Sequence, residues 1–414
     1  MKYELLSSAY YKDITLGYYA ELYRSRFESE AAYKIPKLDV HGSPAFFMML
    51  PEFSLMIENI FANAVKIKDI LDRIPDPAAE KFCKESLIDE IIITNNIEGI
   101  YSTRKEINAI IFKTSKKLRL FEGLVKKYQL LLTNRPLALN SCQDIRSLYD
   151  DIVLNEVEAD SIPDGEIFRK ESVSVYSITD KEKHRGSYPE HKIISEMTSL
   201  LEFMNTPTEI SYLIKIAVFH YFFGYIHPFY DGNGRTNRVI TSYYINKTLS
   251  SNLIGLNLAH AIKDRKNEYY HAFDDCNNSK CKGDITPFVS MFLNIMEEST
   301  FKTLDKLSSY FQKLDHYHGA LQLYSTAVNI SLNQSRCIFL LIQNELFRNE
   351  GLAIEEISQY LEKSDNTSRT IIKSISSING IVIRTKTISN KKYYHLDLGA
   401  FDEVLDKFLP TQQA

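Results

Sequence analysis

Nine consecutive residues, His227-Pro228-Phe229-Tyr230-Asp231-Gly232-Asn233-Gly234-Arg235, set the expected architecture of this chain. The segment before them, 211–226, is nearly all apolar and too short for a membrane span, which predicts a central buried helix. The glycines permit positive φ and close backbone approach, so we expect a sharp turn into a second helix, 235–249. The backbone N–H groups at the start of such a helix form a binding site for anions.

The side chains of this loop predict chemistry on a phosphate. Arg235 offers a fork of donors for phosphate oxygens, and Arg238 lies one turn later, where it can reach the next phosphate. Asp231 supplies the hard oxygen ligand that Mg²⁺ takes between phosphates. His227 can act as a general base near neutral pH.

Each part of the loop also has an ordinary explanation. A single His at a helix end is usually a capping or core residue, and Gly-Asn-Gly is usually a turn. The coincidence of all nine residues favours a phosphate site with its own base. The loop is not a P-loop, because it has no Gly-Lys-Ser/Thr, and it lacks the His-Glu-x-x-His spacing of metalloproteases.

The rest of the chain predicts a mostly α protein of two or three domains, because apolar residues recur at three- and four-residue spacing. Residues 1–50 are expected to form a polar arm, and helices are expected at 51–71, 78–98, 143–155 and 189–205. Gly99 is well placed as a helix stop, and 102–106 as a capping-box start. The alternating segment 173–178, followed by a charged turn at 179–186, predicts a β-hairpin flap. A further helix is expected at 267–276, and another begins at Thr286-Pro287.

Composition excludes several classes of protein. The net charge of −4 gives no global attraction to nucleic acid or membrane. Five scattered cysteines favour a reducing compartment over a disulfide framework, and Cys276 and Cys281 have no partners for a zinc site. With no signal-peptide pattern in residues 1–12 and no apolar run of ~20 residues, a cytoplasmic protein is expected.

The loop with Arg238 beyond it resembles the signature His-Pro-Phe-x-(Asp/Glu)-Gly-Asn-Gly-Arg-x-x-Arg of Fic-domain proteins, and it matches at every position. The resemblance covers roughly residues 50–300. It implies that the fold is an α-helical bundle with a flap. It also implies that the protein transfers AMP from ATP to a Ser, Thr or Tyr hydroxyl of a protein. His227 would then deprotonate the hydroxyl and Asp231 would hold Mg²⁺.

The resemblance also assigns the nucleotide contacts. It implies that Asn233 and the backbone of residues 232–235, which includes Gly232 and Gly234, hold the α- and β-phosphates, while the flap at 173–189 aligns the target by strand addition. Asn267 and Tyr270 stand where such proteins contact the nucleoside. The alternative for these two is that they are ordinary residues of a helix surface.

A second segment, Thr94-Asn95-Asn96-Ile97-Glu98-Gly99, resembles the Fic inhibitory motif (Ser/Thr)-x-x-x-Glu-(Gly/Asn). Thr94 and Glu98 are one helical turn apart on one face. A Glu98 carboxylate offered to Arg238 would compete with the γ-phosphate of ATP, so the chain is expected to be auto-inhibited. The alternative is that Glu98 is merely a last-turn residue of an amphipathic helix.

The C-terminal segment reads as a separate winged helix-turn-helix, with helices at 334–347, 353–361 and 367–378 and strands at 381–384 and 392–396. Residues 366–396 carry six basic residues and no Asp or Glu, which suggests contact with DNA. The same unit could serve protein contacts or dimerisation instead. The expected divisions are therefore 1–110 with the inhibitory motif, a core at 111–299, a helical connector at 300–332 and the winged helix at 333–414.

Three functions follow from this sequence. The first is an auto-inhibited protein adenylyltransferase acting on unknown target proteins and on itself. The second is the reverse reaction, in which Glu98 orients a water molecule that removes AMP from a modified protein. The third is a DNA-binding regulator acting through 366–396. Family members with this layout are often dimers, so a homodimer is a further expectation of the resemblance.

Overall fold

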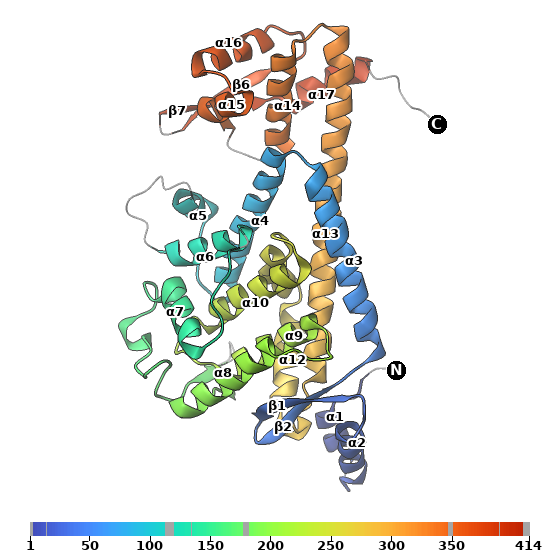
Figure 1. The fold of residues 1–414 in the computed structure, drawn as a ribbon, viewed down its shortest axis with the longest axis vertical. Coiled ribbons are helices and arrows are strands. Elements are labelled where there is room, and N and C mark those ends of the chain that lie inside the picture. Colours follow the sequence, from blue (N-terminus) through green and yellow to red (C-terminus); the bar gives the residue numbers. More distant parts are fainter. Residues whose placement is uncertain are drawn as a thin grey trace. The chain divides into compact units, whose positions relative to one another are not determined.

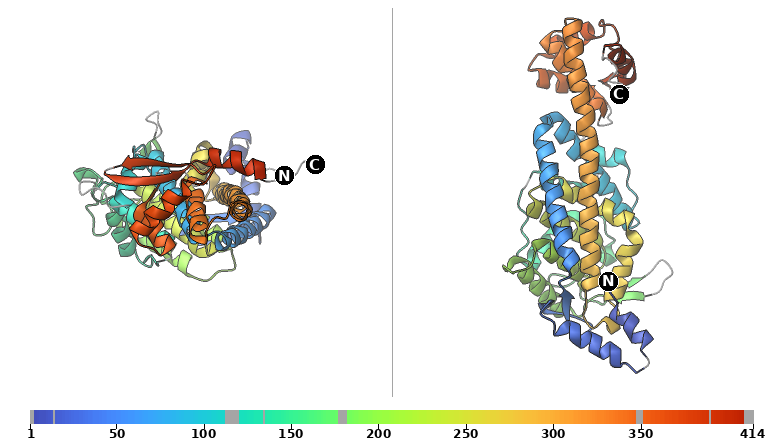
Figure 2. Two further views of the ribbon diagram at one scale, coloured as in Figure 1. Left: turned by 90° about the horizontal axis from the view of Figure 1, so that it is seen from above. Right: turned by 90° about the vertical axis from the view of Figure 1, so that its right-hand side faces the viewer.

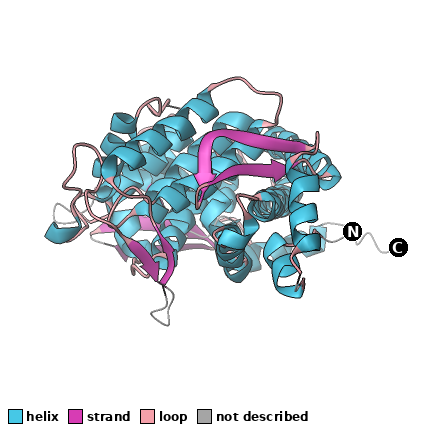
Figure 3. Ribbon diagram, turned by 90° about the horizontal axis from the view of Figure 1, so that it is seen from below, coloured by secondary structure: helices cyan, strands magenta, loops and turns pink. Residues whose placement is uncertain are grey.

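The computed structural model describes residues 3–13, 15–111, 120–133, 135–176, 182–346, 351–388 and 390–408. The chain forms two compact units (Figure 1). The first holds Met1–Lys66 and Ser86–Thr303, and the second holds Ile67–Glu85 and Leu304–Ala414. Helices dominate both units, with strands confined to small sheets (Figure 3). Among the described residues, no helix is long and apolar enough to cross a bilayer.

The first unit is built around α9 (Tyr212–Ile226) and α10 (Asn233–Leu249), which pack against each other on either side of the predicted loop (Figure 1). The apolar sequence of α9 predicted a buried helix, and nearly all its side chains are buried. Each fully buried large apolar side chain stabilises the fold by about 1.5–3 kcal/mol. The helices around this pair are α6 (Glu122–Leu132), α7 (Cys142–Val153), α8 (Glu190–Asn205), α11 (Leu258–Asp264) and α12 (Lys266–Cys276).

Three long helices match the sequence predictions at their starts. They are α3 (Pro51–Arg73), α4 (Asp76–Ile97) and α13 (Thr286–Ala327). In the first unit α3 lies alongside α13, and Asn59 Nδ2 donates to Glu297 Oε1 at 2.7 Å (Figure 2). Gly99 ends the α4 region with φ +75°, a value that glycine tolerates at no steric cost. Helix α5 (Arg104–Ile111) follows, and Thr103 and Glu106 form the predicted capping box.

The prediction of a polar arm at residues 1–50 is wrong. This region holds helices α1 (Leu6–Lys12) and α2 (Gly17–Phe27) and the antiparallel hairpin of β1 (Ala32–Val40) and β2 (Ser43–Met48). Pro36 and Pro44, which break helices, lie within these strands. The hairpin gains its stability from tertiary contact: Phe46 exchanges backbone hydrogen bonds of 2.9 Å with Gly283 and Ile285, just before α13.

The flap contains β3 (Ser174–Tyr176) and β4 (Glu182–Arg185), paired antiparallel with a bulge. The expected turn at 179–186 was therefore too long, because β4 occupies its second half. Residues 177–181, between the strands, lie outside the described part of the chain. At the base of the flap, Ser187 N–H donates to Ile226 O at 3.0 Å, which ties the flap to the end of α9.

The second unit contains α14 (Leu332–Leu346), α15 (Ile354–Leu361), α16 (Asp365–Ile375) and α17 (Leu398–Phe408). Its sheet has the order β5-β7-β6, from Leu352–Ala353, Lys391–Leu396 and Ile383–Ile388. These elements share one apolar core, which includes Leu341, Ile357 and Phe401. The order of three helices and a hairpin follows the sequence, while the winged-helix assignment stays a prediction. The connector expected at 300–332 is mainly the second half of α13, which runs unbroken to Ala327.

Candidate active site in the loop between two buried helices

His227 is the residue at which the central helix ends. Its backbone is left-handed, with φ 53° and ψ 63°, and its N–H closes α9 on Phe223 O at 3.0 Å. The ring Nδ1 lies 3.4 Å from Gly224 O. Because a carbonyl can only accept, this contact places the ring proton on Nδ1 and leaves the Nε2 lone pair as the base.

Burial lowers the pKa of His227 to about 4, and the positive charges of Arg169 and of protonated His184 add to the effect. The negative charge of Glu98 opposes it. The imidazole is consequently neutral at physiological pH and can accept a proton.

The loop after His227 is stabilised by hydrogen bonds between its own residues. Asn233 Nδ2 donates to Phe229 O at 2.8 Å, and its Oδ1 accepts from Phe229 N–H at 3.0 Å. The Phe229 ring stacks on the Tyr149 ring, with 3.7 Å between the ring centroids. A Cβ at Gly232, where φ is +76°, would lie 2.9 Å from Val153 Cγ2. The glycine is thus required both by its backbone angle and by the closeness of α7.

The first turn of α10 lies where the anion site is predicted, and the Glu98 carboxylate lies over it. Thr236 N–H makes the first intrahelical bond, to Gly232 O at 3.1 Å, so the preceding N–H groups have no acceptor within the helix. A Cβ built on Gly234 would lie 2.1 Å from Glu98 Oε1. Glu98 therefore lies directly against the backbone where a phosphate would approach.

Arg238 binds the same glutamate and the turn before it. Its Nη2 donates to Glu98 Oε1 at 2.7 Å and to Thr94 O at 3.0 Å, and its Nε donates to Thr94 Oγ1 at 2.6 Å. The Arg238 side chain is 2% exposed, whereas Glu98 retains 28%. The two motifs, 140 residues apart, thus meet through three hydrogen bonds donated by the Arg238 guanidinium, one of them to the Glu98 carboxylate.

Helix α4 is held in this position by a third residue on the same face. Glu90, one turn before Thr94, is buried, and its carboxyl group accepts from Ala259 N–H at 2.9 and 3.0 Å, near the start of α11. The spacing of four residues places Glu90, Thr94 and Glu98 on one side of the chain. The position of Glu98 is therefore fixed by the fold of α4.

Arg235 has a partner that the sequence did not reveal. Its Nη1 forms a buried ion pair with Glu156, whose other oxygen accepts from Phe121 N–H at 3.0 Å. Arg235 Nε has no hydrogen-bond partner among the described residues, so the guanidinium keeps unused donor capacity. Glu156 lies 79 residues before Arg235, and no local pattern links the two.

Asp231 is exposed, and its Oδ1 accepts from Gly232 N–H at 2.6 Å. In the part of the chain that the structure describes, no group of three or more His, Cys, Asp or Glu residues could hold a metal. Mg²⁺ usually takes one or two carboxylates and completes its shell with water and substrate phosphates. A lone Asp231 beside the anion site fits a Mg²⁺ that binds together with a nucleotide.

Residues 139–245 match the sequence profile of the Fic/DOC family. Among curated proteins, the chain is 30% identical over 175 residues to protein adenylyltransferase Fic of Drosophila virilis and 36% identical over 89 residues to that of Drosophila yakuba. These matches cover 42% and 22% of this chain. The chain carries a Fic domain. The matches cover only 27% and 15% of the length of those two relatives.

Solved structures of Fic proteins are also similar to this chain. A Fic family protein from Desulfovibrio desulfuricans G20 aligns with 82% of this chain and 95% of its own, with a TM-score of 0.48 and 18% identity. Fic-1 from C. elegans aligns over 63% of this chain and 75% of its own, with a TM-score of 0.44 and 19% identity.

Tyr270 and Asn267 both lie on α12, next to the Fic domain. Burial raises the pKa of the Tyr270 hydroxyl, and the nearby negative charge of Glu98 adds to the rise. Its side chain remains 43% exposed, as a ligand contact requires. Asn267 is exposed on the preceding turn, and its contact with a nucleoside stays a prediction.

Arg169 is a further residue of the Fic domain that the sequence reasoning missed. It is fully buried, and its Nε donates to His227 O at 2.9 Å. Its two other nitrogens donate to the carbonyls of Glu171, Ser187 and Ile226. A fully buried arginine among aliphatic and loop residues has no helical or strand periodicity by which it could be found.

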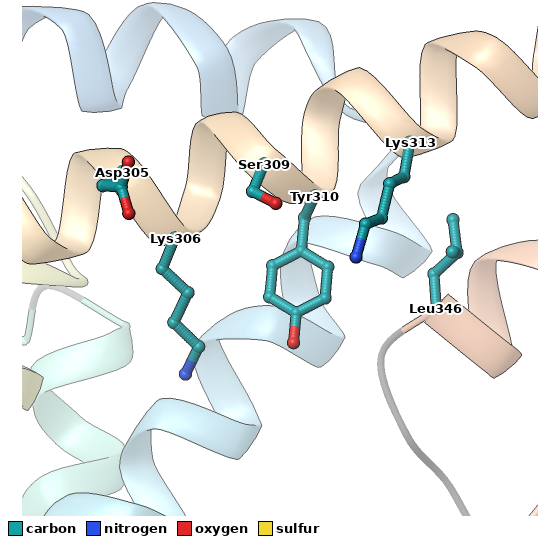
Figure 4. A pocket seen from close by; sticks show the side chains of 6 residues that line it. All are labelled: Asp305, Lys306, Ser309, Tyr310, Lys313 and Leu346. Carbon is teal, nitrogen blue, oxygen red and sulfur yellow. The ribbon is translucent and has the colours of Figure 1, made fainter.

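The second unit has a separate hollow beside α13, and Figure 4 shows its lining. The six side chains around it are Asp305, Lys306, Ser309, Tyr310, Lys313 and Leu346. None of them belongs to the Fic loop or to the inhibitory motif. The candidate site is therefore assigned from the loop and not from a cavity.

Proposed function

We propose that this chain is a protein adenylyltransferase that transfers AMP from ATP to a hydroxyl group of a protein, and that Glu98 holds it inactive. The observation that carries the proposal is the position of the Glu98 carboxylate. It lies against Gly234 at the start of α10 and binds Arg238 at 2.7 Å, within the anion site that follows the base His227. A negative group at this position is what a nucleotide phosphate would have to replace.

The residues present suit transfer of an AMP group. The target hydroxyl oxygen attacks the α-phosphorus, and the bond from that phosphorus to the oxygen bridging to the β-phosphate breaks. Pyrophosphate leaves, and the hydroxyl proton passes to Nε2 of His227. The N–H groups of the first turn of α10 would stabilise the charge on the phosphates, and Arg238 would bind the γ-phosphate. Asp231 would hold Mg²⁺, which neutralises phosphate charge when bound.

Glu98 blocks this reaction in two ways. It occupies Arg238, and it places a negative charge where the triphosphate must enter. ATP bound without the Arg238 contact would not present its α-phosphorus in line with the target hydroxyl, and a misplacement of about 1 Å can lower a rate ~100-fold. Displacement of Glu98 by a partner or by a second copy of the chain would then start the reaction.

The experiment is AMP transfer from radiolabelled ATP by wild type, Glu98→Gly and Glu98→Gly/His227→Ala proteins. We expect strong self-labelling of the first variant, weak labelling of wild type and none of the double variant. Equal labelling of all three proteins would contradict the proposal. ATP binding by the double variant, measured by calorimetry, shows whether the site itself is intact.

The reverse reaction is a second candidate, because Glu98 is only partly buried and one of its oxygens lies outside the Arg238 pair. That oxygen could orient a water molecule toward an AMP ester on a modified protein. Incubation of purified AMP-modified target with wild type and Glu98→Gln separates the two reactions. Release of AMP by wild type but not by the variant would support removal.

DNA binding by the second unit is a candidate supported by one observation. The six basic residues of 366–396 are all exposed, on α16 and on the β6–β7 hairpin, and they are Arg369, Lys373, Arg384, Lys386, Lys391 and Lys392. Six phosphate contacts would give a slope of about −5 in log K against log salt. A salt-titrated gel shift with random duplex tests this, and absence of binding at low salt would leave protein contact as the role of the unit.

A further inference from the structure

Arg169 joins the three segments on which the proposed reaction depends. Its Nε donates to His227 O at 2.9 Å, and its Nη2 donates to Ser187 O at 2.8 Å and to Ile226 O at 3.4 Å. Its Nη1 donates to Glu171 O, in the segment that precedes β3 of the flap. One guanidinium thus binds the end of α9, the residue that carries the base, and both sides of the flap base.

The surroundings of Arg169 are built to hold it. Its backbone N–H donates to Pro228 O at 3.3 Å, and the preceding N–H groups of residues 166–168 donate to the Glu190 carboxylate at 2.8–3.1 Å. Arg146 Nη1 binds Ile167 O at 2.9 Å. The backbone that leads to Arg169 is therefore held by side chains of α7 and α8.

Gly186 shows how closely the flap approaches this arginine. A Cβ at Gly186 would lie 2.5 Å from Arg169 Nη2 and 2.9 Å from His227 Cβ. Any side chain there would separate the flap from the base. Absence of a side chain is thus required by the closeness of three segments.

We infer that Arg169 is a positioning residue for the proposed AMP transfer, which holds His227 and the target-aligning flap in one fixed relation. Carbonyl oxygens need a donor when they are buried, and the five N–H donors of a guanidinium can satisfy four of them at once. The inference rests on the proposed function, because the value of this geometry depends on a target hydroxyl being presented to His227 by the flap.

The same arginine acts on His227 through its charge. The groups that affect the His227 ring are Arg169, His184 on β4 and Glu98 after α4, and burial is the largest influence. Arg169 disfavours a second positive charge on the ring, so loss of its charge would raise the pKa of His227 toward its ordinary value. A purely structural residue would not move the acid limb of the pH profile.

The experiment uses the full chain in the Glu98→Gly background, in which the site is not blocked. Arg169→Lys keeps the positive charge but loses the planar set of guanidinium N–H donors, and Arg169→Gln loses both the charge and these donors. The matched control is Lys170→Gln, which removes the neighbouring exposed cation. The measurements are kcat and KM for AMP transfer to the target or to the chain itself, the pH profile of kcat, and thermal unfolding.

We expect both Arg169 variants to lose about 10- to 100-fold in kcat, with little change in KM for ATP. The acid limb should move upward in pH for Arg169→Gln and stay in place for Arg169→Lys, and the control should match its parent. An unchanged kcat in the Lys variant would overturn the inference, whether or not the Gln variant folds. If the Glu98→Gly parent itself transfers no AMP, the proposed function fails first, and the two failures remain distinct.

Discussion

Replacing Glu98 by Ala removes the carboxylate from Arg238 while leaving the rest of α4 in place. The perturbation is local, because Glu98 follows Ile97, the last residue of the helix, and α4 is held separately by Glu90. A charge-assisted hydrogen bond contributes about 1.5–3 kcal/mol. Because the Glu98 side chain is 28% exposed, the lower half of this range applies, and ATP in the productive position should become about 10- to 40-fold more populated.

The assay is the initial rate of AMP transfer from radiolabelled ATP at a nucleotide concentration below saturation. Glu98→Ala should be faster than wild type by that factor, and Glu98→Gln, which keeps an acceptor without the charge, should lie between them. Arg238→Ala should be slow despite losing the same contact, since the clamp itself is gone. The matched control is Glu80→Gln, an exposed glutamate on the same helix. A Glu98→Ala rate equal to wild type would show that Glu98 does not restrain the reaction, and an active Arg238→Ala would show that Arg238 is not needed for it.

Three further predictions concern the same site. In Glu98→Gly protein, kcat/KM should stay level through neutral pH and fall only at or below about pH 4, because His227 must be unprotonated, its pKa is about 4 with Glu98 present, and removal of the Glu98 charge lowers that pKa further; an inflection near the ordinary histidine value would contradict this. Glu156→Gln should lower the unfolding free energy of the first unit by about 3–5 kcal/mol in urea denaturation, because Arg235 would be left buried without its counter-charge. Chelation of Mg²⁺ by EDTA should abolish transfer, and Asp231→Ala should raise the Mg²⁺ concentration needed; transfer that is indifferent to EDTA would remove the metal from the account.

The local parts of the site could be predicted from sequence because they depend on neighbouring residues. Local sequence predicts the conformation at three places: the apolar segment before His227, the glycines of the loop and the turn at Gly99. The spacing of Thr94 and Glu98 likewise follows from one helical turn. The helices α3, α4, α9 and α13 were therefore expected near their observed starts.

The rest depended on contacts between distant parts of the chain. The β1–β2 hairpin contains prolines and gains its stability from hydrogen bonds to Gly283 and Ile285. No local sequence pattern predicts these bonds. Glu156 and Arg169 are single charged residues in irregular segments, and they become meaningful only when the fold brings them to Arg235 and His227. An unexplained buried charge is recognisable in a structure but not in a single sequence.

The proposed function has two parts: the loop transfers AMP, and Glu98 restrains the transfer. Intact mass spectrometry of wild type, Glu98→Gly and Glu98→Gly/His227→Ala proteins after incubation with ATP and Mg²⁺ tests both parts at once. We expect AMP-sized mass additions on Glu98→Gly, few on wild type and none on the double variant. Absence of any addition to Glu98→Gly, or an equal addition to the double variant, would contradict the proposed function.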